Sequence, residues 1–160
     1  MSIWTCLAHS RLNALLAVAF RLYLGGLFIY ASIYKITYPA VFAESIANYQ
    51  IVPYALVGVM AVVLPWVELL CGILLIVGVR SRSACAFICA MLVMFLSAVV
   101  WVLVADIPVG CGCFHSQEDP ISWLTALRDA GWLAMAVHVF FFDSLFHLEN
   151  RFSWTLEELS

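Results

Sequence analysis

The sequence has few charged residues. Of its 160 residues, 11% are Asp, Glu, Lys or Arg, whereas a typical water-soluble domain has about 25%. Its seven basic residues are scattered and its net charge is −3, so no nucleic acid is expected as a partner. Because 66% of the residues are hydrophobic and the mean hydropathy is +1.06, the chain cannot cover a water-exposed surface. The composition predicts an integral membrane protein whose solvent is the lipid bilayer.

Internal repeats, low-complexity tracts and long linkers are also missing from the sequence, so we expect a single domain over residues 1–160. A membrane-spanning helix needs about 18 or more consecutive, mostly apolar residues. Four segments satisfy this requirement, namely 14–34, 54–78, 83–105 and 121–142. The expected fold class is therefore an all-α membrane protein, a four-helix transmembrane bundle.

Two shorter segments are expected to form helices outside the bundle. The segment that begins at Pro39 has apolar residues at helical spacing, which predicts a short interfacial helix between the first two spans. The tail from Ser144 places its leucines on one face, which predicts an amphipathic C-terminal helix.

Basic residues are distributed unevenly between the ends of the spans. Arg11, Arg80, Arg82 and Arg151 lie on one side, and Lys35 alone lies on the other, where the loop 106–120 has no basic residue. Because Lys and Arg are enriched on the cytoplasmic side, we expect a multi-pass protein of the cell inner (plasma) membrane with both termini in the cytoplasm. The 106–120 loop is then periplasmic, in an oxidising compartment where a disulfide can persist.

That loop contains two cysteines separated by one glycine, in the sequence GCGCFH. A disulfide between Cys111 and Cys113 would close a small, strained ring, and strain makes a disulfide easier to reduce. We therefore favour thiol–disulfide exchange by these two cysteines. Two alternatives remain open, which are capture of Cu(I) or zinc by Cys111, Cys113 and His115, and a purely structural turn.

The attacking group in such an exchange is a thiolate, which nearby cations favour. Lys35 lies at the outer end of the first span, and Arg128 lies about 10 Å below the outer edge at a helical rise of about 1.5 Å per residue. We expect these two residues and His115 to modulate the cysteine pair. The remaining cysteines, Cys6, Cys71, Cys85 and Cys89, receive no role, since buried thiols usually pack as small hydrophobic groups.

Ionisable residues also occur inside the spans, where each costs about 2.5–3.5 kcal/mol on insertion scales. By the same helical rise, Arg21 and Glu68 lie about 10 Å and about 15 Å from the cytoplasmic edge. We expect them to form an intramembrane polar pair that fixes the helix register; a proton path or a binding site for a quinone or partner is the alternative. His138, about 7 Å deep, is expected to be a core histidine. No residue pattern selects a cofactor, so none is expected beyond the cysteine pair.

Several motifs in the chain occur together in one known group of proteins. They read RLYLGGLFIYASIYK at 21–35, NYQIVP at 48–53, PWVELLCG at 65–72 and CGCF at 111–114, followed by an arginine at 128. In combination they resemble the MauE/DoxX group of small four-helix membrane proteins, over about residues 15–142. The chain departs from that group at His115, where glycine is usual, and at Asp129, where asparagine is commoner.

The resemblance implies a redox-associated inner-membrane protein that works with a periplasmic thioredoxin-like partner. It further implies a link to methylamine utilisation, in which the family is associated with maturation of the disulfide-rich small subunit of methylamine dehydrogenase. The expected function is support of disulfide formation or maturation of periplasmic clients, for which a thiol–disulfide oxidoreductase activity is one expectation. The alternatives are a non-catalytic assembly or docking factor and a copper- or zinc-handling protein. A quinone-linked oxidoreductase is less favoured, because the sequence has no Cys-x-x-Cys motif.

Overall fold

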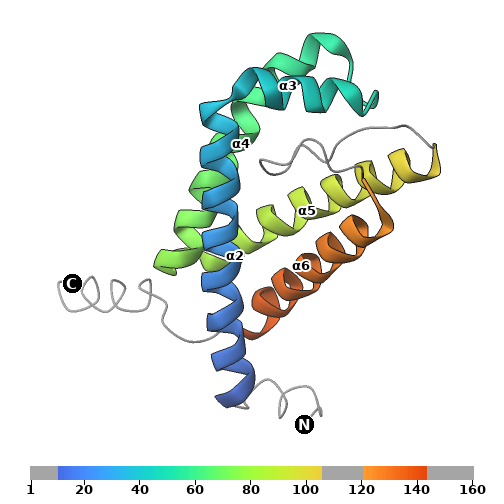
Figure 1. Cartoon of the computed structure of the whole chain (residues 1–160). Helices are drawn as coiled ribbons and strands as arrows, with labels where there is room; N and C mark the ends of the chain where they lie inside the picture. The colour runs from blue at the N-terminus through green and yellow to red at the C-terminus, as the bar shows by residue number, and fades with distance from the viewer. Residues whose placement is uncertain (1–10, 106–120, 144–160) are drawn as a thin grey trace, which may run out of the picture.

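The computed structural model describes residues 11–105 and 121–143, in which all regular secondary structure is helical (Figure 1). The predicted all-α fold is thus confirmed. The spans predicted from hydropathy begin and end within three residues of four observed helices, and a fifth helix is short. The helices are α2 (Arg11–Thr37), α3 (Pro39–Asn48), α4 (Tyr54–Val77), α5 (Ser81–Val104) and α6 (Trp123–Phe142).

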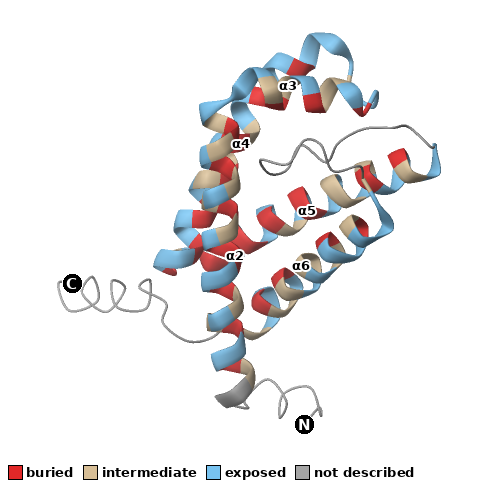
Figure 2. Ribbon diagram, viewed as in Figure 1, coloured by how far each residue is buried: buried red, intermediate tan, exposed pale blue. Residues whose placement is uncertain are grey.

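Three of these helices, α2, α4 and α5, are long and apolar enough to cross a membrane. Large apolar side chains are exposed on all three helices, among them Leu22, Val62 and Phe87, as expected where lipid replaces water. Exposed and buried positions alternate along the helices (Figure 2). The protein is therefore a multi-pass membrane protein. Helix α6 has 20 residues, which is about 30 Å of helix, but its hydropathy is lower than that of these three helices and it carries Arg128 and Asp129. A fourth crossing stays a prediction.

The short helix expected after the first span is present as α3. It begins at Pro39, whose missing amide hydrogen costs nothing in the first helical turn. Its position at a membrane interface stays a prediction, and the amphipathic helix expected from Ser144 lies outside the described residues.

The long helices pack as two pairs, α2 with α4 and α5 with α6, and the pairs meet through contacts of α2 with α6 and of α4 with α5 (Figure 1). A tight turn joins α4 to α5. It contains Gly78 in the left-handed conformation at φ 78°, with its amide donating to the carbonyl of Leu74 at 2.9 Å, which is a common way to end a helix. The two pairs diverge from their meeting point toward the end that carries α3 (Figure 1).

The core lies where the two pairs meet. Cys85 is fully buried there and its thiol lies 3.0 Å from the carbonyl oxygen of Ala136. Cys71 is buried and Cys89 is half-buried, and all three thiols are free. This placement agrees with the expectation that these cysteines pack as small hydrophobic groups. The buried cluster consists of Leu24, Phe28, Cys71, Leu75, Cys85, Ile88, Leu92, Ala136 and Val139.

Two glycines bring α2 and α4 into close contact. A Cβ atom at Gly25 would lie 3.0 Å from the carbonyl oxygen of Gly72, and a Cβ atom at Gly72 would lie 3.0 Å from the carbonyl oxygen of Gly25. Small residues at such positions let membrane helices pack backbone against backbone. The Gly25–Gly72 contact therefore sets the register of the two helices.

Candidate functional site

A buried ion pair joins α2 to α4. The ammonium nitrogen of Lys35, in the last turn of α2, lies 2.7 Å and 2.8 Å from the two carboxylate oxygens of Glu68. The two side chains are only 4% and 2% exposed. A buried charge needs a partner at hydrogen-bonding distance to offset its desolvation, and each of these two residues provides that partner for the other.

Two aromatic rings enclose the same ammonium group. The nitrogen of Lys35 lies 4.9 Å from the ring centre of Phe42 on α3 and 4.9 Å from that of Phe95 on α5. A cation at this distance from an aromatic face is attracted to its negative potential. Lys35 thus connects four helices, α2 and α4 through the ion pair and α3 and α5 through the rings.

The predicted pairing of Arg21 with Glu68 is wrong. Gly25 and Gly72 face each other at one level of the bundle. Arg21 lies one helical turn to one side of that level, and Glu68 lies one helical turn to the other side. At about 1.5 Å per residue they are therefore about 12 Å apart along the bundle. The depth estimate failed because it assumed that both helices end at the same level.

Arg21 instead faces the residue that follows α6. Its guanidinium lies 3.3 Å from both carboxylate oxygens of Asp143, and the two side chains are 4% and 1% exposed. This pair is hard to predict from hydropathy, because Asp143 stands just past the predicted end of the last span. Nearby, the ring of His138 packs against Phe20 and Phe142, at centroid distances of 5.4 Å and 4.7 Å.

A second acidic residue approaches the Lys35–Glu68 pair from α6. Asp129 is 4% exposed and accepts hydrogen bonds from the guanidinium of Arg128 at 3.1 Å and 3.2 Å. Asp129, Lys35 and Glu68 all line one cavity of about 50 Å³, which is large enough for water. Two carboxylates and an ammonium around such a cavity can hold and transfer a proton.

Arg128 itself is less enclosed than these three residues. Its side chain is 39% exposed, and its guanidinium carbon lies 4.6 Å from the ring centre of Trp132. The four charges of Lys35, Glu68, Arg128 and Asp129 sum to zero. Each acidic side chain of the cluster therefore has a basic partner, Lys35 for Glu68 and Arg128 for Asp129.

The cysteine pair and its neighbour, Cys111, Cys113 and His115, lie outside the described residues. The predicted modulation of these cysteines by Lys35 and Arg128 therefore stays a prediction, although the structure gives both cations carboxylate partners, Glu68 and Asp129. Within 11–105 and 121–143, no three His, Cys, Asp or Glu side chains are grouped closely enough to hold a metal ion. The alternative metal site at Cys111, Cys113 and His115 falls beyond these ranges.

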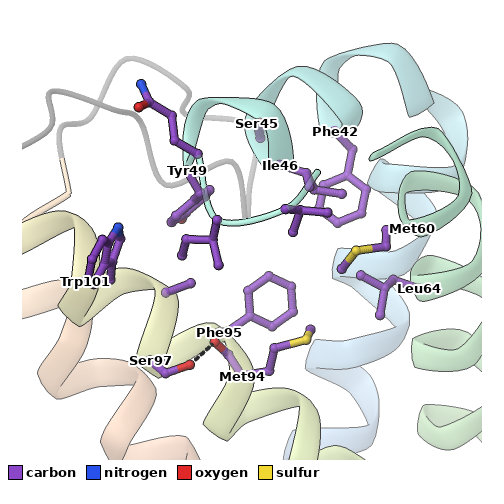
Figure 3. Close-up of a pocket in the computed structure, with 14 residues that line it drawn as sticks. Phe42, Ser45, Ile46, Tyr49, Met60, Leu64, Met94, Phe95, Ser97 and Trp101 are labelled. Carbon is purple, nitrogen blue, oxygen red and sulfur yellow. Dashed lines mark hydrogen bonds between the residues drawn. The ribbon is translucent and has the colours of Figure 1, made fainter. Parts of the chain in front are cut away.

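A larger cavity of about 520 Å³, which we term the outer cavity, lies between α3, α4 and the C-terminal half of α5 (Figure 3). Its walls are mostly apolar and aromatic. Phe42 and Phe95 line it and also contact the Lys35 ammonium, so the ion pair lies directly behind one wall. Sequence reasoning missed this cavity, because it exists only where the two helix pairs diverge and α3 folds over the opening.

Helices of membrane length meet around buried side chains of opposite charge. This arrangement defines the class of the protein, which is an all-helical multi-pass membrane protein with an intramembrane polar site. Comparison with known proteins identifies the family. The family model for methylamine utilisation protein MauE matches residues 13–142, and the chain belongs to this family. The resemblance to MauE is thus confirmed, and the DoxX part of it stays a prediction.

Two relatives named methylamine utilization protein MauE support this assignment. The protein from Paracoccus denitrificans is 31% identical over 123 residues, 76% of this chain and 66% of the relative. The protein from Methylorubrum extorquens is 30% identical over 108 residues, 66% of this chain and 58% of the relative. The match therefore spans less than two thirds of the length of either relative. No solved structure matches it significantly.

Proposed function

We propose that this protein supports methylamine utilisation as a thiol–disulfide redox protein of the inner membrane. The observation that carries the proposal is the Cys-Gly-Cys segment inside the region that matches the MauE family. Both relatives are named for methylamine utilisation. The distribution of basic residues supports cytoplasmic termini and a periplasmic position for the loop.

In the proposed reaction, a periplasmic thioredoxin-like partner exchanges a disulfide with Cys111 and Cys113. A thiolate of one reactant attacks the disulfide of the other, and the displaced sulfur leaves as a thiolate. The resulting mixed disulfide is resolved by the second cysteine. Two electrons pass in the exchange, so one dithiol is oxidised while one disulfide is reduced. The client whose disulfides depend on this partner would be the small subunit of methylamine dehydrogenase.

The Lys35–Glu68 pair supports this role by holding the helices that frame the loop. Lys35 is two residues from the end of α2, and the loop joins α5 to α6, whose residues Phe95 and Asp129 lie beside the pair. A change in the relative positions of these helices would therefore move the two ends of the loop. No cofactor other than the cysteine pair is needed for the exchange itself.

Substitution of the two cysteines tests the proposal. The full-length Cys113→Ser and Cys111→Ser variants are expressed in methylamine-grown cells, with Cys89→Ser as the control for loss of a thiol in the membrane. One of the two loop variants, the one that lacks the resolving cysteine, is expected to accumulate a reductant-sensitive covalent complex with a periplasmic protein. Both should leave client disulfides incomplete by alkylation gel shift, because neither completes the exchange.

The Cys111→Ser/Cys113→Ser double variant should form no such complex. If both single variants keep client disulfides and growth on methylamine at the level of Cys89→Ser, thiol exchange at this loop is wrong. A non-catalytic docking role would then remain, and it predicts that the partner still co-purifies with the double variant.

A further inference from the structure

The mouth of the outer cavity opens beside α5, a helix that is long and apolar enough to cross a membrane. Its lining residues Ile51, Met94 and Trp101 are 49%, 38% and 57% exposed, whereas Phe42 and Tyr49 at its closed side are 4% and 8% exposed. Met94 and Trp101 belong to α5, a membrane-length helix that ends at Val104. By helical rise they lie about 15 Å and about 5 Å from that end. A molecule that enters here comes from the bilayer, so it is lipid-soluble.

The size and the walls of the cavity suit a ring. Its volume of about 520 Å³ falls within the range of about 300–1,000 Å³ that is typical of small-molecule sites. Phe42, Tyr49, Phe95 and Trp101 line it from α3, from the residue that follows α3, and from α5 (Figure 3). Aromatic side chains pack favourably against another ring by offset stacking or edge-to-face contact.

Two serines also line the cavity, Ser45 from α3 and Ser97 from α5 (Figure 3). Ser97 donates its hydroxyl hydrogen to the carbonyl of Met94 at 2.7 Å, and Ser45 donates to the carbonyl of Val41 at 3.0 Å. A hydroxyl oxygen used in this way keeps lone pairs that accept a further hydrogen bond. The cavity thus presents polar positions on two walls to a ring that bears oxygen substituents.

From the lipid-facing mouth, the aromatic walls and the hydroxyls of Ser45 and Ser97, we propose that the outer cavity is a binding site for a lipid-soluble ring compound of the quinone and quinol class. The contacts of Phe42 and Phe95 with the Lys35 ammonium place the bound ring one side chain away from the Lys35–Glu68 pair. This site goes beyond the proposed thiol exchange, and its existence does not depend on that exchange.

The test measures binding of decylubiquinone to the purified full-length protein in detergent. The protein is expected to show saturable quenching of its tryptophan fluorescence, because Trp101 lines the cavity. The blocking variant is Ala98→Phe, since Ala98 lines the cavity and is half-buried. Its matched control is Ala90→Phe on the same helix, at an exposed position that does not line the cavity. Ala98→Phe should weaken binding by about tenfold or more, and Ala90→Phe should leave it unchanged.

A second variant covers the case in which Ala98→Phe fails to fold. Ile51→Phe narrows the mouth at an exposed position between helices, and it should also weaken saturable quenching. Quenching that does not saturate, or that is equal in all four proteins, overturns the proposal. A second result would also overturn the proposal. If dioleoylphosphatidylcholine displaces the probe and the blocked variants lose co-purified phospholipid, the cavity holds an acyl chain. Failure of this test leaves the cysteine exchange test unaffected.

Discussion

Glu68→Ala is expected to destabilise the folded protein by about 3–5 kcal/mol, the usual cost of removing one partner of a buried ion pair. The substitution leaves the Lys35 ammonium enclosed by Phe42 and Phe95 with no carboxylate against it. On the scale of soluble proteins of this size, the loss corresponds to a fall of about 6–20 °C in the unfolding temperature. Thermal unfolding of the detergent-purified protein, followed by size-exclusion chromatography, measures this effect.

The control for charge alone is Glu44→Ala, because Glu44 is an exposed carboxylate on α3. It should change the unfolding temperature little. The double variant Lys35→Met/Glu68→Leu removes both charges and should recover most of the lost stability, since no unpaired charge remains. If the double variant is as unstable as the sum of the two single variants, the ion pair is not the cause.

The same double variant separates stability from function. A folded double variant that restores client disulfides would show that the pair only holds helices together. A folded double variant with defective disulfides would show that the charges themselves contribute to activity, as the adjoining cavity beside Asp129 suggests.

Gly72→Val is expected to force α2 and α4 apart. Even the first side-chain atom would lie 2.9 Å from Cγ1 of Ile29 and 3.0 Å from the carbonyl oxygen of Gly25, closer than atoms pack without a shift. Overpacking of this kind costs about 1–3 kcal/mol. Because Glu68 is one turn away on the same helix, the Lys35–Glu68 distance should increase as well. Unfolding temperature and the yield of monodisperse protein measure the effect.

Gly26→Val is the matched control for this substitution. Gly26 is next to Gly25 but faces outward, and a Cβ atom there would have no neighbour within 4 Å. Replacing a helical glycine at an open position is expected to be neutral or mildly stabilising, by up to about 1 kcal/mol. Equal loss of stability in the two variants would contradict a role for close helix approach.

The helices were predictable because the signals that determine them are local. Long, mostly apolar runs predicted four helices to within three residues, and Pro39 marked the start of α3. Of the residues that form the polar site, only Glu68 was predicted to belong to an intramembrane pair. Lys35 was predicted to act on the cysteine loop, and Asp129 was noted only as a departure from the MauE/DoxX group. What could not be predicted was which of them meet.

Partner choice depends on how far one helix is shifted along its neighbour. The Gly25–Gly72 contact fixes that shift. As a result, Glu68 pairs with Lys35 and Arg21 pairs with Asp143. The outer cavity has a similar origin, because it requires the divergence of two helix pairs that hydropathy does not encode (Figure 1). Hydrophobic patterns in the sequence therefore predict where the helices lie, whereas small residues at helix contacts determine which polar side chains meet.

The place of Lys35 in the last turn of α2 matters for how the chain enters the membrane. Synthesis proceeds from the N-terminus, so α2 leaves the ribosome before Glu68 on α4 exists. A lysine two residues from the end of α2 can extend its ammonium toward the headgroups and remain hydrated until its carboxylate partner is present. The charge then needs to move inward only when α4 and α3 arrive. The position of Lys35 thus allows α2 to insert before α4 is present, and the burial of its ammonium becomes a late step of assembly.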